Sequence, residues 1–492
     1  MNKRVSRFFC AAVILTTCLA TVSCHKDPVV NPDDDPDADT LVVDVDAPAK
    51  DFLRSQYMNI YYYWQSEVIG RNAVLDPSKY DIYDYFDAML YEKDRWSWMC
   101  DRQYYVDSES GIVIGTYGAS LGQPIEYYDD YGVYVRYVYP DSPFAKNGVT
   151  RGCLLTHIDG VEVMDLIIAG VFDLKMNTSP HAFTFTDPSG KIFTFTTEWA
   201  TSLNVKSSLD VKLFTESDFP GLQEPVGYFN YLSFKANFLD DIINAMEILK
   251  AASVKTLILD LRYNGGGDSR ASQMLVNYLA PADKNGQIYV KRVHNKLLSS
   301  ADDICKVGAV VTDPVSGDKL TGSSIGIEHL YIITGSGMAS ASEMVANGLR
   351  PMMDVKMVGD TTYGKPNGMY VLMYPGSDAD YTKYDKGDFS KLEWVFLPIC
   401  FYNNNGVGES IPDSGFVPDC YRPDDLYHDF NANELSIKAC LTHIVTGSFP
   451  QMPEKKSVAT RAAGKRVKLC ISEEEKDPHY GLYLVDKHAE ER

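Results

Sequence analysis

The sequence LYIITGSGMASASEMVANGL at residues 330–349 decides the fold class. Its start is an apolar run typical of a buried strand, its middle is rich in glycine and serine, and its end has the composition of a helix. Strands that alternate with helices predict an α/β domain, in which ligand sites form beyond the carboxyl ends of the strands. The loop that holds Ser336, Ser340 and Ser342 is therefore a candidate functional site.

The same alternation runs through the chain from about residue 225. Strand-like and helix-like runs follow one another: GYFNYLSF, FLDDIINAMEILKAA, TLILDLR and SRASQMLVNYL. The first helical run places Leu239, Ile242 and Met246 on one face, as an amphipathic helix requires. We expect a mixed sheet that is at least partly parallel. A glycine loop at residues 264–267 follows TLILDLR, and it is the second candidate site at the carboxyl ends of the strands.

Composition divides the 492 residues into six regions, and apolar and charged residues, at 45% and 23%, are ordinary for a globular protein. The predicted fold class is multidomain α+β. The regions are a signal peptide at 1–24, a disordered acidic tether at 25–48, a helical N-terminal domain at 49–105, a β-rich module at 106–205, an α/β core with a mixed sheet at 206–450 and a C-terminal extension of unknown role at 451–492.

The first 24 residues have the pattern of a targeting segment. Lys3, Arg4 and Arg7 precede the apolar run FFCAAVILTTCLATV, and Cys24 follows. This pattern resembles a bacterial lipoprotein signal, which implies that Cys24 carries lipid; a plain secretory peptide is the alternative. We expect a lipid anchor in the bacterial cell envelope, on the outer membrane and facing the periplasm or the cell surface. A net charge of -21 argues against nucleic acid as a partner.

The cysteines form neither a disulfide framework nor a metal site. Cys10 and Cys18 leave with the signal peptide, and the cysteines beyond Cys24 are odd in number and widely spaced. They are Cys100, Cys153, Cys305, Cys400, Cys420, Cys440 and Cys470. One or two bridges are compatible with an oxidising compartment, but the spacing pairs none of them. No metal and no organic cofactor is expected.

The β-rich module contains YPDSPFAKNGVTRGCLLTHIDGVEV at residues 139–163. The order of strand, S-P-F-A turn, glycine, strand and D-G turn resembles a PDZ domain, and an unrelated small β domain is the alternative. The resemblance implies a short helix at the S-P-F-A turn. It also implies that the module binds an extended peptide at a sheet edge.

The serine loop has a structural explanation of its own. Ser340 and Glu343 fit a capping box, in which Ser340 caps the helix and Glu343 binds back to the backbone. Two further motifs change this interpretation, because Thr362-Tyr363-Gly364-Lys365 follows the loop and LDLRYNGGG precedes it.

These motifs together resemble the C-terminal-processing (tail-specific) serine peptidases, a family that joins a PDZ domain to a Ser-Lys protease core. The resemblance covers residues 50–445 and includes Asp260-Leu261-Arg262 with the glycine loop, Ser340-Ala341-Ser342-Glu343, and the Thr362 to Lys365 motif. It implies cleavage of peptides or unfolded proteins near their C-termini. The roles that it implies are nucleophile for Ser340, general base for Lys365, oxyanion donors for Ala341 and Gly266, and support of the site for Glu343 and Thr362.

Elementary chemistry agrees with these roles. A serine at a helix N-terminus lies where free N–H groups favour developing negative charge. A serine hydroxyl needs a base, and a lysine serves only if burial lowers its pKa well below about 10.4. The sequence departs from the family at Met369, where many members carry a glutamine that orients the lysine; Asn367 is a possible substitute. This departure leaves a second hypothesis, a non-catalytic peptide-binding lipoprotein with a protease-like fold.

Overall fold

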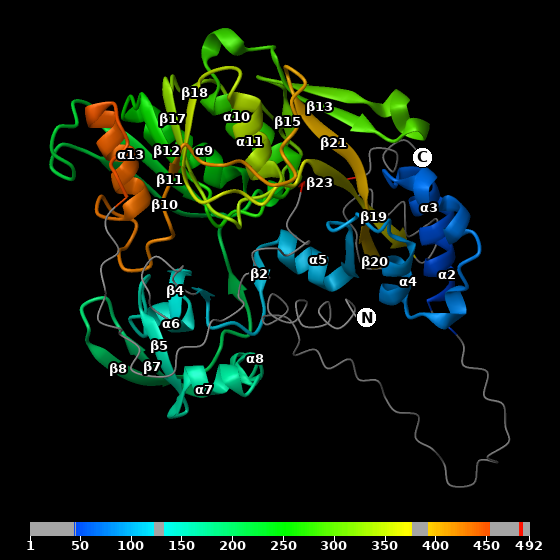
Figure 1. The fold of residues 1–492 in the computed structure, drawn as a ribbon, viewed down its shortest axis with the longest axis horizontal. Helices are drawn as coiled ribbons and strands as arrows, with labels where there is room; N and C mark the ends of the chain where they lie inside the picture. Colours follow the sequence, from blue (N-terminus) through cyan, green and yellow to red (C-terminus); the bar gives the residue numbers. More distant parts are fainter. Residues whose placement is uncertain (1–43, 45, 123–131, 376–391, 453–481, 486–492) are drawn as a thin grey trace.

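The computed structural model describes residues 44, 46–122, 132–375, 392–452 and 482–485 (Figure 1). The predicted signal peptide, Cys24 and nearly all of the predicted tether lie outside the described residues. Within the described part of the chain, no helix has both the length and the apolar character needed to span a bilayer.

The centre of the molecule is a six-stranded mixed sheet. Its order is β10 (Ser208–Phe214), β11 (Val226–Tyr231), β12 (Thr256–Asp260), β17 (His329–Thr334), β18 (Asp354–Gly359) and β22 (Cys420–Tyr421). All neighbouring strands are parallel except β10, which runs antiparallel to β11. The predicted mixed α/β core is confirmed, because the apolar runs GYFNYLSF, TLILDLR and LYIIT each overlap one of these parallel strands.

Helices cover both faces of this sheet, with α13 on the opposite side from α10 and α11 (Figure 1). The helices are α9 (Leu239–Ala251), α10 (Ser269–Leu279), α11 (Ala341–Leu349) and α13 (Leu435–Thr446). Leu257 and Leu259 of β12 pack into the cluster with α9 to α11, whereas Ile258 packs into the cluster with α13. A strand buried on both faces has to be apolar at every position, which explains the continuous apolar runs.

A second sheet was not predicted from the sequence. Its order is β1 (Trp98–Asp101), β20 (Leu392–Leu397), β19 (Asn367–Pro375), β21 (Ile399–Asn405), β13 (Ile288–His294) and β14 (Asp303–Lys306), and β23 (Leu482–Val485) also pairs with β19. Two short pairs, β2 (Ile112–Val113) with β9 (Leu203–Asn204) and β15 (Val311–Thr312) with β16 (Lys319–Leu320), lie apart from it.

The N-terminal helices pack against this second sheet. They are α2 (Ala47–Phe52), a π-helix at Leu53–Tyr61, α3 (Gln65–Asn72), α4 (Ile82–Met89) and, after β1, α5 (Arg102–Glu109). The rings of Tyr57 and Phe86 lie 5.8 Å and 6.2 Å from the ring of Phe396 in β20. The N-terminal helices and the α/β core contribute to one hydrophobic cluster. The aromatic side chains of the N-terminal sequence are therefore part of the core.

The β-rich module has its own sheet, β3 (Ala119–Gly122), β4 (Val133–Val138), β5 (Leu154–Ile158), β7 (His181–Thr186) and β8 (Ile192–Thr197), with β6 (Val161–Glu162) beside β5. Three short helices, α6 (Pro143–Lys146), α7 (Val163–Ile168) and α8 (Phe172–Met176), accompany it. The expected short helix begins at the S-P-F-A turn, where Ala145 N–H donates to Ser142 Oγ at 3.2 Å. Asp159 and Gly160, with φ of 52° and 77°, form the turn between β5 and β6.

Six cysteines lie within the described residues, and none of them forms a disulfide there. They are Cys100, Cys153, Cys305, Cys400, Cys420 and Cys440, and all but Cys305 are buried. Cys470 lies outside the described residues. The five buried thiols therefore act as small side chains in the core.

Candidate active site

Three loops that sequence motifs singled out meet at one edge of the central sheet. The glycine loop follows β12, the serine loop follows β17, and the loop that contains Lys365 follows β18. These strands are parallel neighbours, with Asp260 opposite Ile333 and Thr334 opposite Gly359, so their carboxyl ends lie side by side. Parallel order thus brings together residues that are about a hundred positions apart in the chain.

Ser340 occupies a strained position at the start of α11. It is the helix N-cap, with φ of 54° and ψ of -110°, and its exposed fraction is 1%. Positive φ at a residue with a side chain costs about 1–3 kcal/mol and persists only where the surroundings impose it. Ser342 is different, because its Oγ donates to Asn264 O at 2.8 Å inside the first turn. Of these two serines, Ser340 is the one held in a strained turn.

The carboxylate of Glu343 connects the serine loop to the loop after β18. Its Oε2 accepts from the N–H groups of Ser340 at 2.9 Å and Lys365 at 2.8 Å. Its Oε1 accepts from Thr362 Oγ1 at 2.5 Å and from Gly364 N–H at 2.8 Å. The predicted capping contact of Glu343 is therefore present, and the same carboxylate also fixes the chain around Lys365.

Lys365 is fully buried, with an exposed fraction of 0%. The loop that contains Lys365 is hydrogen-bonded to the serine loop, because Tyr363 N–H donates to Met338 O at 2.9 Å. Thr362 is also buried, and its Oγ1 accepts from Phe416 N–H at 2.7 Å while it donates to Glu343. Thr362 is thus a structural link of the site.

The glycine loop lies directly against Ser340 and Ala341. A Cβ placed on Gly266, whose φ is +104°, would come within 2.9 Å of Ala339 O, 2.9 Å of Ala341 N and 3.0 Å of Ser340 Cβ. Asn264 O accepts from Ala339 N–H at 3.2 Å as well as from Ser342, which fastens the two loops together. This close approach is the reason for glycine at position 266.

The two predicted oxyanion donors differ in this structure. Among the described residues, the N–H of Ala341 has no acceptor, as expected for the first position of a helix. The N–H of Gly266 donates to Asn264 Oδ1 at 2.9 Å. The Gly266 amide is therefore engaged, and it would have to turn from Asn264, or share its proton, to bind a developing oxyanion.

Asn367 and Met369 begin β19 just beyond Lys365, and both are 0% exposed. Within the described residues, the carboxamide oxygen and nitrogen of Asn367 make no hydrogen bond of normal geometry. Met369 packs in an apolar cluster with Trp96, Val371 and Leu397. Asn367 is thus a buried polar group that interacts with the Tyr402 hydroxyl and lies just beyond Lys365, whereas Met369 fills hydrophobic space.

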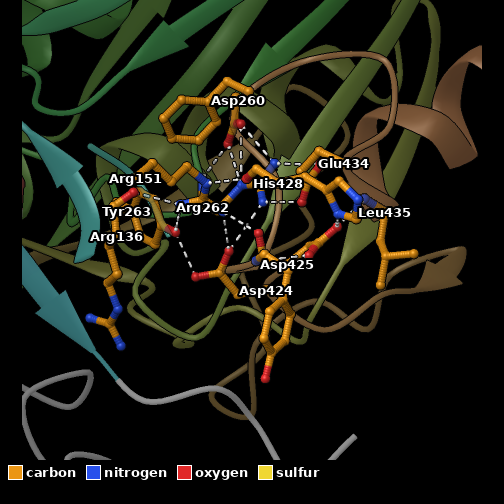
Figure 2. Close-up of polar contacts among 12 residues, drawn as sticks. Arg136, Arg151, Asp260, Arg262, Tyr263, Asp424, Asp425, His428, Glu434 and Leu435 are labelled. Atoms are coloured by element: carbon orange, nitrogen blue, oxygen red, sulfur yellow. Dashed lines mark hydrogen bonds and ion pairs between the residues drawn. The ribbon is translucent and has the colours of Figure 1, made fainter. Parts of the chain in front are cut away.

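A buried network of charges surrounds Arg262 and Tyr263, the residues just before the glycine loop (Figure 2). Arg262 bridges Asp260 and Glu434, with nitrogen to oxygen distances of 2.9 Å and 2.6 Å. Arg151 of the β-rich module donates to Tyr263 Oη at 2.6 Å. The network therefore ties the loop to α13 and to the β-rich module at once.

Asp424 is the carboxylate that the two arginines share. Its Oδ1 lies 2.8 Å from Arg151 and 3.2 Å from Arg262, and its Oδ2 accepts from Tyr263 Oη at 2.5 Å. Burial alone would raise the pKa of Asp424, but the two guanidiniums hold it below its ordinary value. Burial raises the pKa of Glu434, and Arg262 opposes that rise.

Sequence reasoning did not find this network. Asp260 and Arg262 were recognised only as part of a motif, and Asp424 and Glu434 were not singled out. The available signal was charge inside the buried run TLILDLR, since a charged side chain in such a strand requires a buried partner.

In the described residues, no group of three or more His, Cys, Asp and Glu side chains is arranged to bind a metal ion.

Comparisons with known proteins show which family the sequence resembles. The sequence model of peptidase family S41 matches residues 225–389. The chain is 26% identical over 259 residues to the carboxyl-terminal-processing peptidase 2, chloroplastic, of Arabidopsis thaliana, which covers 52% of this chain and 45% of the relative. It is 24% identical over 200 residues to the carboxy-terminal processing protease CtpA of Bacillus subtilis, covering 39% of this chain and 37% of that one. The chain thus spans about half the length, or less, of these curated relatives.

A solved structure shares the fold. The crystal structure of a putative S41 protease from Bacteroides fragilis aligns with a TM-score of 0.61 at 20% identity, over 80% of this chain and 96% of that chain. The matched region contains all three loops of the candidate site. Residues 225–389 are therefore a domain of peptidase family S41, a family of serine proteases, and the chain is a homologue of the carboxy-terminal processing proteases.

Proposed function

We propose that the protein is a serine endopeptidase that cleaves peptides or unfolded proteins near their C-termini, with Ser340 as nucleophile and Lys365 as general base. One observation carries the assignment: Glu343 Oε2 accepts from the backbone N–H of both residues, at 2.9 Å and 2.8 Å. A single carboxylate thus sets the positions of a strained serine and a buried lysine relative to each other.

The reaction follows from the chemistry of the two side chains. Ser340 Oγ attacks the peptide carbonyl carbon while Lys365 Nζ, in its neutral form, accepts the hydroxyl proton. The resulting ammonium returns the proton to the leaving amine as the C–N bond breaks, which leaves an ester on Ser340. Water, deprotonated by the same lysine, then hydrolyses the ester and restores the free serine.

The negative charge that develops on the carbonyl oxygen needs donors in a desolvated site. Ala341 N–H, which has no acceptor among the described residues, is one donor in this proposal. Gly266 N–H is the second once it leaves Asn264 Oδ1. The departure of Met369 from the family pattern leaves Asn367 to orient Lys365, because its buried carboxamide has unused hydrogen-bonding capacity in the described structure.

The test is cleavage of an unstructured protein such as casein by the full chain, beside Ser340→Ala and Lys365→Ala. Each substitution is expected to lower kcat/KM by at least about 10³-fold, because the dyad acts as a unit. Ser336→Ala, a serine in the same loop, is the matched control and should retain activity.

Two results would overturn the proposal. One is complete inactivity of the unsubstituted chain toward every unstructured substrate. The other is equal cleavage by Ser340→Ala. Far-ultraviolet circular dichroism and thermal unfolding of each variant show whether a loss of activity reflects misfolding instead.

The location of the enzyme is a separate proposal. We infer that Cys24 is lipidated, that the protein is held in the bacterial cell envelope, and that the β-rich module acts as a PDZ-like peptide-binding domain. The signal-like sequence and the S-P-F-A and D-G turns support this. Metabolic labelling with a palmitate analogue should mark the unsubstituted chain but not Cys24→Ala; label on both would contradict the anchor.

A further inference from the structure

The strand that follows Lys365 has two edges, and they are occupied differently. Along one edge, β21 and β20 pair antiparallel with β19, from Asn367 opposite Tyr402 to Leu372 opposite Phe396, with one shift of register between Gly368 and Met369. Along the other edge, β23 pairs in parallel, with Gly368 opposite Leu482. The second edge is therefore filled by a segment that arrives from the C-terminal end of the chain.

β23 contacts two elements that begin at the candidate catalytic loops. Besides β19, it contacts α10. β19 starts at Asn367, two residues beyond Lys365, and α10 starts at Ser269, just beyond the glycine loop. An extended segment in this place is thus in contact with the strand after the base and with the helix after the oxyanion loop.

We propose that this edge of β19 is a peptide-docking edge of the active site, and that the chain's own strand Leu482–Val485 occupies it in competition with substrates. The inference rests on the proposed peptidase function and adds the way in which a peptide is bound. Addition of a strand to an open sheet edge is a general mode of peptide recognition, because the main chain provides affinity for many sequences. An unpaired edge beside a catalytic site would otherwise present free N–H and C=O groups to solvent.

The parallel register defines the direction of a docked peptide. Leu482 lies opposite Gly368 near Lys365, and Val485 lies opposite Val371, farther along β19. A peptide in this register therefore points its C-terminal part away from Lys365 and presents the bonds on its N-terminal side to the dyad. This polarity suits an enzyme that cuts upstream of a C-terminus.

A tethered competitor raises the apparent KM and leaves kcat unchanged. Effective concentrations of tethered segments are of order millimolar, so a segment with a dissociation constant near 100 μM would raise KM by about 10-fold. A variant that ends at Met452 should thus show kcat/KM about 10-fold above that of the full chain, entirely through KM.

Binding can be measured without any cleavage. The probe is a fluorescent peptide of residues 481–492, GLYLVDKHAEER, added to the chain that ends at Met452 and carries Ser340→Ala. It should bind saturably and slow hydrogen exchange of the amides at residues 368–371. The full chain with Ser340→Ala should bind the probe at least about 10-fold more weakly, because its own segment is in place.

Point substitutions give a matched pair in the full chain. Leu484→Pro removes an N–H and breaks the ladder of β23, whereas Lys487→Pro introduces the same ring two positions after Val485, the last residue of β23. Leu484→Pro should lower KM and speed exchange at residues 368–371, and Lys487→Pro should do neither.

The outcomes separate this inference from the proposed function. If peptides are cleaved but removal of residues 453–492 changes neither KM nor exchange at β19, the docking edge is wrong and the peptidase stands. If nothing is cleaved but the probe binds and protects β19, the docking edge stands and the peptidase is wrong. Probe binding that leaves the β19 amides unprotected also overturns the inference.

Discussion

At the scale of single residues, the site depends most on the carboxylate of Glu343. Burial raises its pKa, and hydrogen bonds from Thr362, Lys365, Gly364 and Ser340 oppose that rise. The four donors come from two loops, so the carboxylate acts as a fixed connector between nucleophile and base. A helix cap alone would use only the contact from Ser340.

Glu343→Gln should reduce both stability and kcat. The amide offers a single acceptor atom, so its NH₂ group must face donors that now bind a carboxylate oxygen. Each donor left without an acceptor costs about 1–3 kcal/mol in the free energy of unfolding. Urea unfolding and steady-state kinetics measure both effects. The exposed Glu247→Gln is the control, and equal behaviour of the two variants would show that the connector has no role.

At the scale of elements, the glycine loop and the N-terminus of α11 form one unit. The loop reaches the helix so closely that position 266 has no room for a Cβ. Asn264, in the glycine loop, binds the serine loop through its carbonyl, which accepts from Ser342 Oγ. Its Nδ2 donates to Tyr231 O at 2.9 Å, which fastens the glycine loop to the end of β11. The position of the oxyanion donors is therefore set by contacts between elements rather than within one loop.

Gly266→Ala should lower kcat by roughly 10²-fold, since it displaces the Ala341 amide and the loop that faces it. It should also lower the free energy of unfolding by about 1–3 kcal/mol, through strain at φ of +104° and through overpacking. Gly408→Ala is the matched control, because its φ is +93° and a Cβ there meets nothing within 4 Å. If Gly408→Ala lowers kcat as much, the close approach is not the cause.

At the scale of the whole molecule, the buried arginines join three parts of the chain. Arg151 donates to Arg136 O at 2.6 Å within the β-rich module, to Tyr263 Oη beside the glycine loop, and to Asp425 O at 3.0 Å ahead of α13. A guanidinium can serve several acceptors in fixed directions, which a lysine cannot. We therefore expect Arg151 to hold the module against the core.

Arg151→Ala should therefore destabilise the protein by about 3–5 kcal/mol, because it leaves several buried carbonyl acceptors without a donor and removes one of the two guanidiniums that pair with Asp424. Hydrogen exchange should increase at residues 261–264 and 424–428 as well as in the module. Lys175→Ala, which removes the partly exposed pair with Asp159 inside the module, should cost less than about 1 kcal/mol. Equal costs for the two variants would refute the connecting role of Arg151.

His428 makes the stability of this junction depend on pH. Its Nδ1 lies 2.7 Å from Asp425 Oδ2, and this hydrogen bond raises the pKa of His428 above its ordinary 6.5, although burial lowers it. A raised pKa in the folded state gives stabilisation that is complete below about pH 6.5 and is lost as pH rises through the folded pKa. The difference in Tm between the unsubstituted chain and His428→Gln should thus shrink from pH 6 to pH 8. His157→Gln serves as control, and a difference that is constant with pH would contradict the prediction.

Much of the core could be predicted from local patterns. The apolar run of the strand at Thr256–Asp260 and the helical spacing of apolar residues in the helix at Leu239–Ala251 each predict the element from its own short sequence. The second sheet could not be predicted, because its strands pair across long stretches of chain, as Trp98 does with Leu397. In addition, polar residues occupy buried positions of this sheet, such as Asn403 and Asn405 in β21, so the strand lacks the apolar pattern that would predict it.

The sequence by itself determined the order of the three motifs, the α/β class of the core and the candidate residues Ser340 and Lys365, because these depend on residue type and local periodicity. Only the tertiary structure decided that Glu343 binds both of their backbones, that the Gly266 amide is engaged by Asn264, and that the Leu482–Val485 strand lies beside β19. The reason is physical. A hydrogen bond between distant segments depends on strand order and packing, and no local propensity of either segment encodes its partner.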